Sequence, residues 1–256
     1  MKNQIQYKRH KRFILTVASL AILMATAIGV NAAEISHSEF LTYARTDYPK
    51  LLEAMIIGYD SRVTDYTGTL SKQERVNGKL RKPQTTNFKF RNRPFSIFMQ
   101  WTKNPGKIDR LLFVKGQNKN KMVVHPTGIA SFIKSLERPP ACKEVFKANL
   151  RSCDKFGIRN MLQRLQTNSK TAQLIYLGET KVDNRNCITI ETIVPMADKP
   201  NEFTRMTIKV DLVHRLPVSV TSRDKNGNLL STYTYTNLKF NTNLTDADFT
   251  KKANKL

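Results

Sequence analysis

The 256-residue sequence lacks the short motifs that mark the common enzyme classes. It contains no HExxH, no GxSxG and no glycine-rich phosphate loop. The motifs typical of zinc proteases, serine hydrolases and nucleotide-binding enzymes are therefore absent. Beyond position 32, histidine occurs only as His37, His125 and His214. Cys187 with His125 stays open as a nucleophile and base, because spatial neighbours need not be sequence neighbours. We expect no catalytic residues, no metal site and no cofactor.

Acidic residues are absent from the first 32 positions. Five Lys and Arg residues precede the apolar run 13–30, and Val30-Asn31-Ala32 has small residues at the two positions that signal peptidase reads. We expect residues 1–32 to be a signal peptide that is cleaved after Ala32, which places the mature protein in the periplasm. An uncleaved membrane anchor is the alternative, since the apolar run reaches the lower limit for spanning.

Negative charge is also scarce in the rest of the chain. Without the five basic residues of the signal region, 38 Lys and Arg residues face 20 Asp and Glu residues. This surplus is expected to attract an anionic membrane surface or envelope polysaccharide. Nucleic acid is another polyanion, but export argues against it. A solvated basic surface without a role in binding is the alternative.

Cysteine occurs three times, as Cys142, Cys153 and Cys187, with the spacing of neither a zinc ribbon nor a CxxC redox pair. Disulfides persist in exported proteins, and the first two cysteines flank a short segment. We therefore expect a Cys142–Cys153 bridge. Free thiols or a bridge to Cys187 remain open.

No repeat and no Gly-, Ser- or Pro-rich linker divides residues 33–256, which predicts one domain. Residues 36–59 have helical spacing of apolar residues, and Pro49 must kink or divide that helix. Hairpin signals follow, as at Asn77-Gly78, and an irregular and then helical insertion occupies 128–170. About ten antiparallel strands are expected in one curved sheet with helices over its concave face. The predicted fold class is mainly β with a helical plug (α+β).

The end of the chain has its own pattern. Residues 233–240 alternate as a pleated strand does, and a short capped turn then ends at Phe249. We expect this strand to close the meander and Phe249 to fill an apolar gap.

Several blocks carry a family resemblance: YTGTLSKQERVNGKL (66–80), RPFSIFMQW (93–101) and VDLVHRLPV (210–218). Their order, from Tyr66 to Phe249, resembles an exported bacterial family known as domain of unknown function 1571. That family is distantly similar to the periplasmic lipoprotein carriers (LolA/LolB-like), which fold as a curved antiparallel half-barrel and hold acyl chains. The resemblance implies a lipoprotein-carrier-like half-barrel for residues 33–256, with an N-terminal helix and a central helical insertion.

Alternation in two predicted strands places five large apolar side chains on the face that would line such a cavity: Ile97, Met99, Trp101, Leu111 and Phe113. Core packing beneath the helices is the alternative for each of them. We expect a monomeric, exported envelope protein that binds a lipid or lipidated molecule, with a carrier role open. A non-catalytic interaction or sensing module with a dry core is the alternative. An enzyme acting on envelope polysaccharide is a third possibility.

Overall fold

The computed structural model describes residues 35–167, 169–196 and 199–256. The predicted signal peptide, residues 1–32, lies outside the described residues. The region from residue 34 onward forms one compact unit. None of the helices in the described part of the chain is both long and apolar enough to cross a membrane.

Two helices begin the described chain, α1 (His37–Thr46) and α2 (Tyr48–Arg62). The hydroxyl of Ser36 accepts a hydrogen bond from the backbone N–H of Glu39, and Asp47 caps α2 in the same way. Pro49 lies in the first turn of α2, where its missing N–H costs nothing. The expected helix over 36–59 is therefore divided in two.

The first strands form a meander that begins at β1 (Asp65–Val76). The six that follow are β2 (Lys79–Leu80), β3 (Gln84–Arg91), β4 (Ser96–Lys103), β5 (Ile108–Val114), β6 (Met122–Pro126) and β7 (Leu136–Arg138).

An irregular segment then leads to the remaining strands. It holds η2 (Gly128–Phe132), α3 (Lys143–Phe146), η3 (Cys153–Lys155), α4 (Ile158–Thr167) and η4 (Ser169–Thr171). The second meander contains β8 (Gln173–Val182), β9 (Arg185–Met196), β10 (Lys199–Asp211), β11 (Leu216–Arg223) and β12 (Leu229–Phe240). The segment that follows β12 and ends at Phe249, which we call the hook, contains η5 (Asp246–Phe249). A short η1 (Asn118–Asn120) joins β5 to β6.

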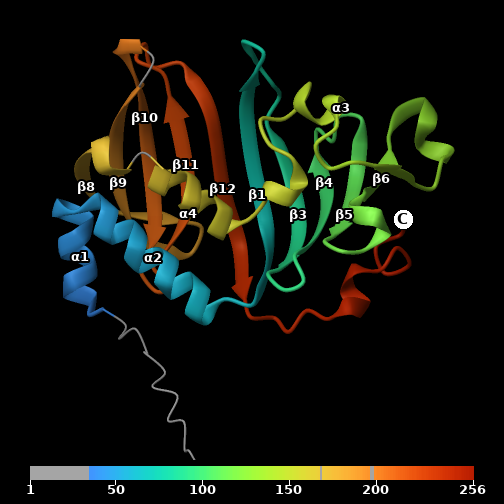
Figure 1. Ribbon diagram of the computed structural model, residues 1–256, viewed down its shortest axis with the longest axis horizontal. Coiled ribbons are helices and arrows are strands. Elements are labelled where there is room, and N and C mark those ends of the chain that lie inside the picture. The colour runs from blue at the N-terminus through green and yellow to red at the C-terminus, as the bar shows by residue number, and fades with distance from the viewer. Residues whose placement is uncertain (1–34, 168, 197–198) are drawn as a thin grey trace, which may run out of the picture. The chain divides into compact units, whose positions relative to one another are not determined.

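All twelve strands described belong to one antiparallel sheet, with the order β7-β6-β5-β4-β3-β1-β12-β11-β10-β9-β8 and β2 beside β1. The sheet is curved and unclosed, which confirms the predicted fold class (Figure 1). β12 pairs with β1, for example Leu70 with Tyr235. The final strand therefore joins the two meanders at the middle of the sheet.

The helices are distributed unevenly over the concave face. In Figure 1, α1, α2 and α4 lie over the half formed by β8–β12, with α1 against β8 and α4 against β11. Phe40, Leu52 and Leu162 from these helices are fully buried there. The half formed by β1 and β3–β7 is covered instead by the segment between β6 and α4, which has little regular structure.

Candidate ligand-binding cavity

A cavity of about 840 Å³ lies on the concave face of the β1–β7 half. Strands β1, β4, β5, β6 and β12 contribute to its wall, and residues 126–157 together with α4 cover it. This volume lies within the range of pockets that hold drug-sized ligands. Much of the wall is large and apolar, including Leu70, Met99, Trp101, Leu111, Met122 and Val124.

Strand register brings the apolar wall together. Met99 in β4 stands opposite Leu111 in β5, and Leu111 stands opposite Val124 in β6. Because side chains directly opposite each other share one face of a sheet, these three form a continuous row. Met99, Trp101 and Leu111, which the sequence alternation placed on a cavity wall, line the cavity. Their contact with a ligand stays a prediction.

Ile97 and Phe113 are on the same face but do not line the cavity. They stand opposite each other in β4 and β5, and both are buried in the core. The ring of Phe95 lies 6.0 Å from that of Phe113 and 5.2 Å from that of Phe90. Ile97 and Phe113 therefore pack in the core beside these aromatic rings, and their contact with a ligand stays a prediction.

The segment that covers the cavity, residues 126–157 (the cover), leads into α4 at Gly157, whose φ of 108° favours glycine. A Cβ there would lie 3.1 Å from the Tyr66 hydroxyl oxygen and from the Phe90 ring. The same hydroxyl accepts a hydrogen bond from the backbone N–H of Ile158 at 2.9 Å. At the far end of the cover, Ile129 lines the cavity while 97% of it is exposed. The cavity therefore opens to solvent beside η2.

The end of the cavity near β1 and β12 is polar. The Tyr233 hydroxyl donates to Glu74, and a guanidinium nitrogen of Arg151 donates to the Tyr233 oxygen. The Lys72 ammonium lies 3.3 Å from the other Glu74 carboxylate oxygen and also donates to the Asn149 side chain. Burial lowers the pKa of Lys72 and raises that of Tyr233, as expected for charged forms deprived of water.

Sequence reasoning missed this polar end. Lys72 and Glu74 lie in a strand whose lysine and glutamate suggest a solvent-facing side, yet both are lining residues. Arg164 of α4 also lines the cavity although its side chain is exposed, and partial desolvation together with the charge of Arg151 lowers its pKa to about 10. The only signal was the odd placement of Lys72 in phase with the apolar Leu70.

The three cysteines are free thiols, so the expected Cys142–Cys153 bridge is not formed in the structure. The Cys153 sulfur lies 3.9 Å from the Met122 sulfur, and burial raises the pKa of Cys153 to about 12. That thiol faces the cavity wall and stays protonated at neutral pH, which makes it a poor nucleophile.

The open pairing of Cys187 with His125 is not supported. His125 in β6 contacts Asp109, with 2.7 Å between its Nδ1 and the carboxylate, whereas Cys187 is in β9. Seven strands separate β6 from β9 in the sheet order. Among the described residues, no three His, Cys, Asp or Glu side chains group closely enough to hold a metal ion. The absence of catalysis and of a cofactor stays a prediction.

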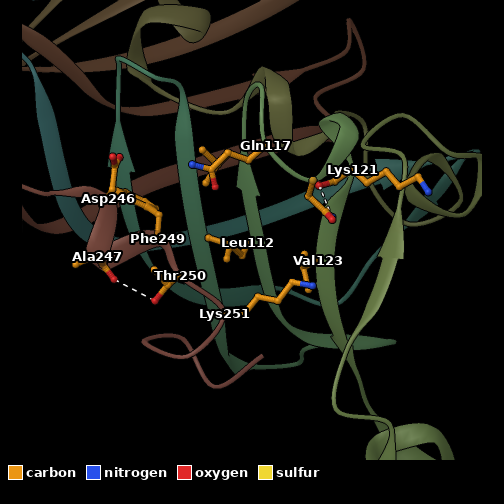
Figure 2. Close-up of a pocket in the computed structure, with 11 residues that line it drawn as sticks. Leu112, Gln117, Lys121, Val123, Asp246, Ala247, Phe249, Thr250 and Lys251 are labelled. Carbon is orange, nitrogen blue, oxygen red and sulfur yellow. Dashed lines mark hydrogen bonds between the residues drawn. The ribbon is translucent and has the colours of Figure 1, made fainter.

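A second, smaller pocket of about 470 Å³ lies on the opposite face of β5 and β6 (Figure 2). Leu112 and Val123 form its floor, and Phe249 of the hook stands beside them. Phe249 is buried, as expected, with the Arg91 guanidinium 5.1 Å from the centre of its ring. The gap that it fills is on the convex face, so the hook does not close the concave cavity. Because the concave cavity is larger and has the longer apolar wall, we take it as the candidate site.

Comparisons with known proteins add the following. A search of curated proteins finds no match. Among solved structures, the crystal structure of MucB has 14% identity and a TM-score of 0.48, covering 85% of this chain and 63% of MucB. The lipoprotein LppX of Mycobacterium tuberculosis has 13% identity and a TM-score of 0.45, covering 77% of this chain and 98% of LppX. LprF of Mycobacterium bovis has 10% identity and a TM-score of 0.45, covering 78% of this chain and 95% of LprF.

The chain spans less than two thirds of the length of MucB. At these identities and TM-scores, function has to be argued from the residues of the cavity. The sequence itself gives a firmer assignment, because residues 63–255 match the family described as a protein of unknown function, DUF1571. That match covers most of the chain and includes every residue lining the concave cavity. The protein is a member of the DUF1571 family.

Proposed function

We propose that this protein binds a lipid or a lipidated molecule in the concave cavity, as an exported protein of the cell envelope. The observation that carries the proposal is the unfilled half of the concave face, where about 840 Å³ is bordered by Met99, Trp101, Leu111 and their neighbours. Protein interiors are normally packed to the density of organic crystals. A void of this size with an apolar wall is suited to an apolar guest that excludes water.

The wall is also adaptable. Met99, Met122 and Met161 all line it, and methionine is unbranched and polarizable, so it can follow chains of differing shape. Ile129 at the rim marks an opening through which a chain can enter. The alternative of an interaction module with a dry core is disfavoured by the cavity. The basic region and apolar run before Ala32 support export, and the surplus of Lys and Arg supports contact with anionic membrane.

The proposal is tested by extracting the purified protein with organic solvent and identifying bound lipid by mass spectrometry. Two neighbouring valines of β6 give a matched pair, because Val124 lines the concave cavity and Val123 lines the convex pocket. We expect Val124→Trp to fill the cavity and to remove the lipid, while Val123→Trp keeps it. No lipid in the parent protein, or equal loss from both variants, would refute the proposal.

A further inference from the structure

The charges that line the cavity are unbalanced. Its lining contains eight Lys or Arg residues and two Glu residues. The imbalance is sharpest at the polar end, where Lys72, Arg151 and Arg164 meet only the carboxylate of Glu74. Lys72 and Glu74 are largely buried, Arg151 is half-buried and Arg164 is exposed. Water therefore screens the repulsion among the three cations only in part, and an anion at this end would relieve it.

Glu74 cannot balance all three cations. One of its oxygens accepts from the Tyr233 hydroxyl, and the other accepts from Lys72 and from the backbone N–H of Leu150 at 3.3 Å each. Arg151 reaches this carboxylate only through the Tyr233 hydroxyl. Arg164 donates to the backbone carbonyl of Lys155 at 3.4 Å. Across residues 35–256, as far as they are described, neither arginine forms an ion pair with a carboxylate. The polar end of the cavity therefore has a surplus of two positive charges.

The polar end continues directly into the apolar wall. Tyr235 pairs with Leu70, Leu70 with Thr86, and Thr86 with Trp101, so one row of neighbours runs across β12, β1, β3 and β4. Lys72 and Tyr233 pair with each other one pleat further along. A molecule that places one end at the arginines can thus lay the rest along Trp101 and Met99.

Two buried hydrogen-bond donors in the same lining add an independent indication. The indole N–H of Trp101 and the Nε–H of Arg81 have no acceptor within the described structure. A buried donor without a partner costs free energy, and oxygen atoms of a guest would satisfy both.

We infer that the cavity takes an amphiphile with an anionic head, a carboxylate or a phosphate, which Arg151 and Arg164 bind while the apolar chain lies along Trp101, Met99 and Leu111. Guanidinium groups suit this role because their paired N–H groups match the oxygens of such anions. This inference rests on the proposed function and adds the chemical class of the ligand.

The single tryptophan of the sequence makes the test direct, because Trp101 itself lines the cavity. A chain brominated at its middle quenches tryptophan fluorescence on contact. The probes are 9,10-dibromostearate and its neutral counterpart 9,10-dibromostearyl alcohol, titrated at pH 8 below their aggregation limits. We expect the anionic probe to quench at a concentration about tenfold lower or more, as charge-assisted hydrogen bonds imply.

Three sets of variants assign the preference to the polar end. Arg151→Gln with Arg164→Gln should weaken binding of dibromostearate to the level of the alcohol. Glu74→Gln removes the competing carboxylate and should tighten dibromostearate binding several-fold, an effect that misfolding cannot produce. Arg159→Gln is the control, because Arg159 is on α4 as well but pairs with Asp60 at the surface. It should leave both titrations unchanged. Thermal unfolding checks that each variant is folded.

The outcomes separate this inference from the proposed function. If neither probe quenches Trp101, the proposed function is wrong. If both quench equally, or if the arginine variants lose both probes to the same extent, the inference of an anionic head is overturned while lipid binding stands. Inorganic phosphate at the concentration of the probe should not displace dibromostearate. Displacement would identify a site for free anions and would overturn the inference that the ligand is an amphiphile.

Discussion

The two halves of the sheet are built alike and are covered differently. Both are antiparallel meanders with large apolar side chains on the concave face, such as Ile188 and Ile208 in one and Met99 and Leu111 in the other. Over β8–β12, helices α1, α2 and α4 fill the concavity with side chains such as Leu52. Over β1–β7, the irregular cover leaves a cavity. The cavity is therefore created by what lies over the sheet, since the strands of both halves supply an apolar floor.

The largest expected effect is a loss of stability at alkaline pH, because both halves contain buried tyrosines that resist ionisation. Burial raises the pKa of five of them, to about 12 for Tyr235; the others are Tyr48, Tyr59, Tyr66 and Tyr233. In the unfolded chain each phenol ionises near pH 10, whereas in the folded protein it stays neutral. Stability is therefore fully present below pH 10 and is lost as pH rises through the folded values.

Each phenol contributes a slope of at most about 1.4 kcal/mol per pH unit above pH 10. The buried thiols act in the same direction, because burial raises the pKa of Cys153 to about 12 and that of Cys187 to about 11. Burial of Lys72 acts in the opposite direction, since it favours the neutral amine, while Arg164 is exposed and water screens its contribution. Seven acids outweigh the one buried base, and the free energy of unfolding should fall by roughly 6 kcal/mol from pH 10 to 11. Urea unfolding at pH 9, 10 and 11 measures this. A stability that does not change over this range would contradict the burial assigned to these tyrosines.

The next prediction compares the loss of stability that a leucine-to-alanine substitution causes in each half. Leu52→Ala in α2 should cost about 3–4 kcal/mol, because tightly packed neighbours leave a new cavity. Leu111→Ala in β5 should cost about 1–2 kcal/mol, since Leu111 already borders open space and loses fewer contacts. Urea unfolding of the protein without lipid measures both. Equal costs would show that the β1–β7 half is packed as densely as the other.

The hook gives a smaller expected effect, between those of the two leucines. Phe249→Ala should destabilise the protein by about 2–3 kcal/mol, below the usual range for phenylalanine because a pocket already adjoins the ring. Bound lipid should be retained, because Phe249 lies on the convex face. Thermal unfolding together with lipid extraction tests both points. Loss of lipid without loss of stability would contradict the separation of the two faces.

Local patterns predicted much of this fold. Alternation in 96–101 placed Met99 and Trp101 on one face, and the turn at Asn77-Gly78 marked a hairpin, as the structure confirms. The short strand β7 escaped notice because three residues carry no periodicity. The pairing of β12 with β1 is a contact between the two ends of the sheet-forming chain, which no local pattern encodes.

The candidate site was predictable only in part, for a physical reason. Ile97 and Phe113 share the face of Met99, but both are core residues, and the ring of Phe95, which comes from a turn, lies against that of Phe113. The polar end joins Arg151 to Tyr233, 82 residues apart in sequence, and Tyr233 to Glu74, 159 residues apart. Each of them alone resembles an ordinary surface residue. Their grouping depends on the cover and on the pairing of β12 with β1.

We expect the β1–β7 half, and not the helix-filled half, to hold an amphiphile. Crystals grown with 9,10-dibromostearate test it most directly, because anomalous scattering locates bromine without prior assumptions. We expect bromine peaks in the concave cavity beside Met99, Trp101 and Leu111, with the carboxylate toward Arg151 and Arg164. Peaks confined to the convex pocket at Phe249 or to spaces among α1, α2 and β8, with the concave cavity empty, would contradict it.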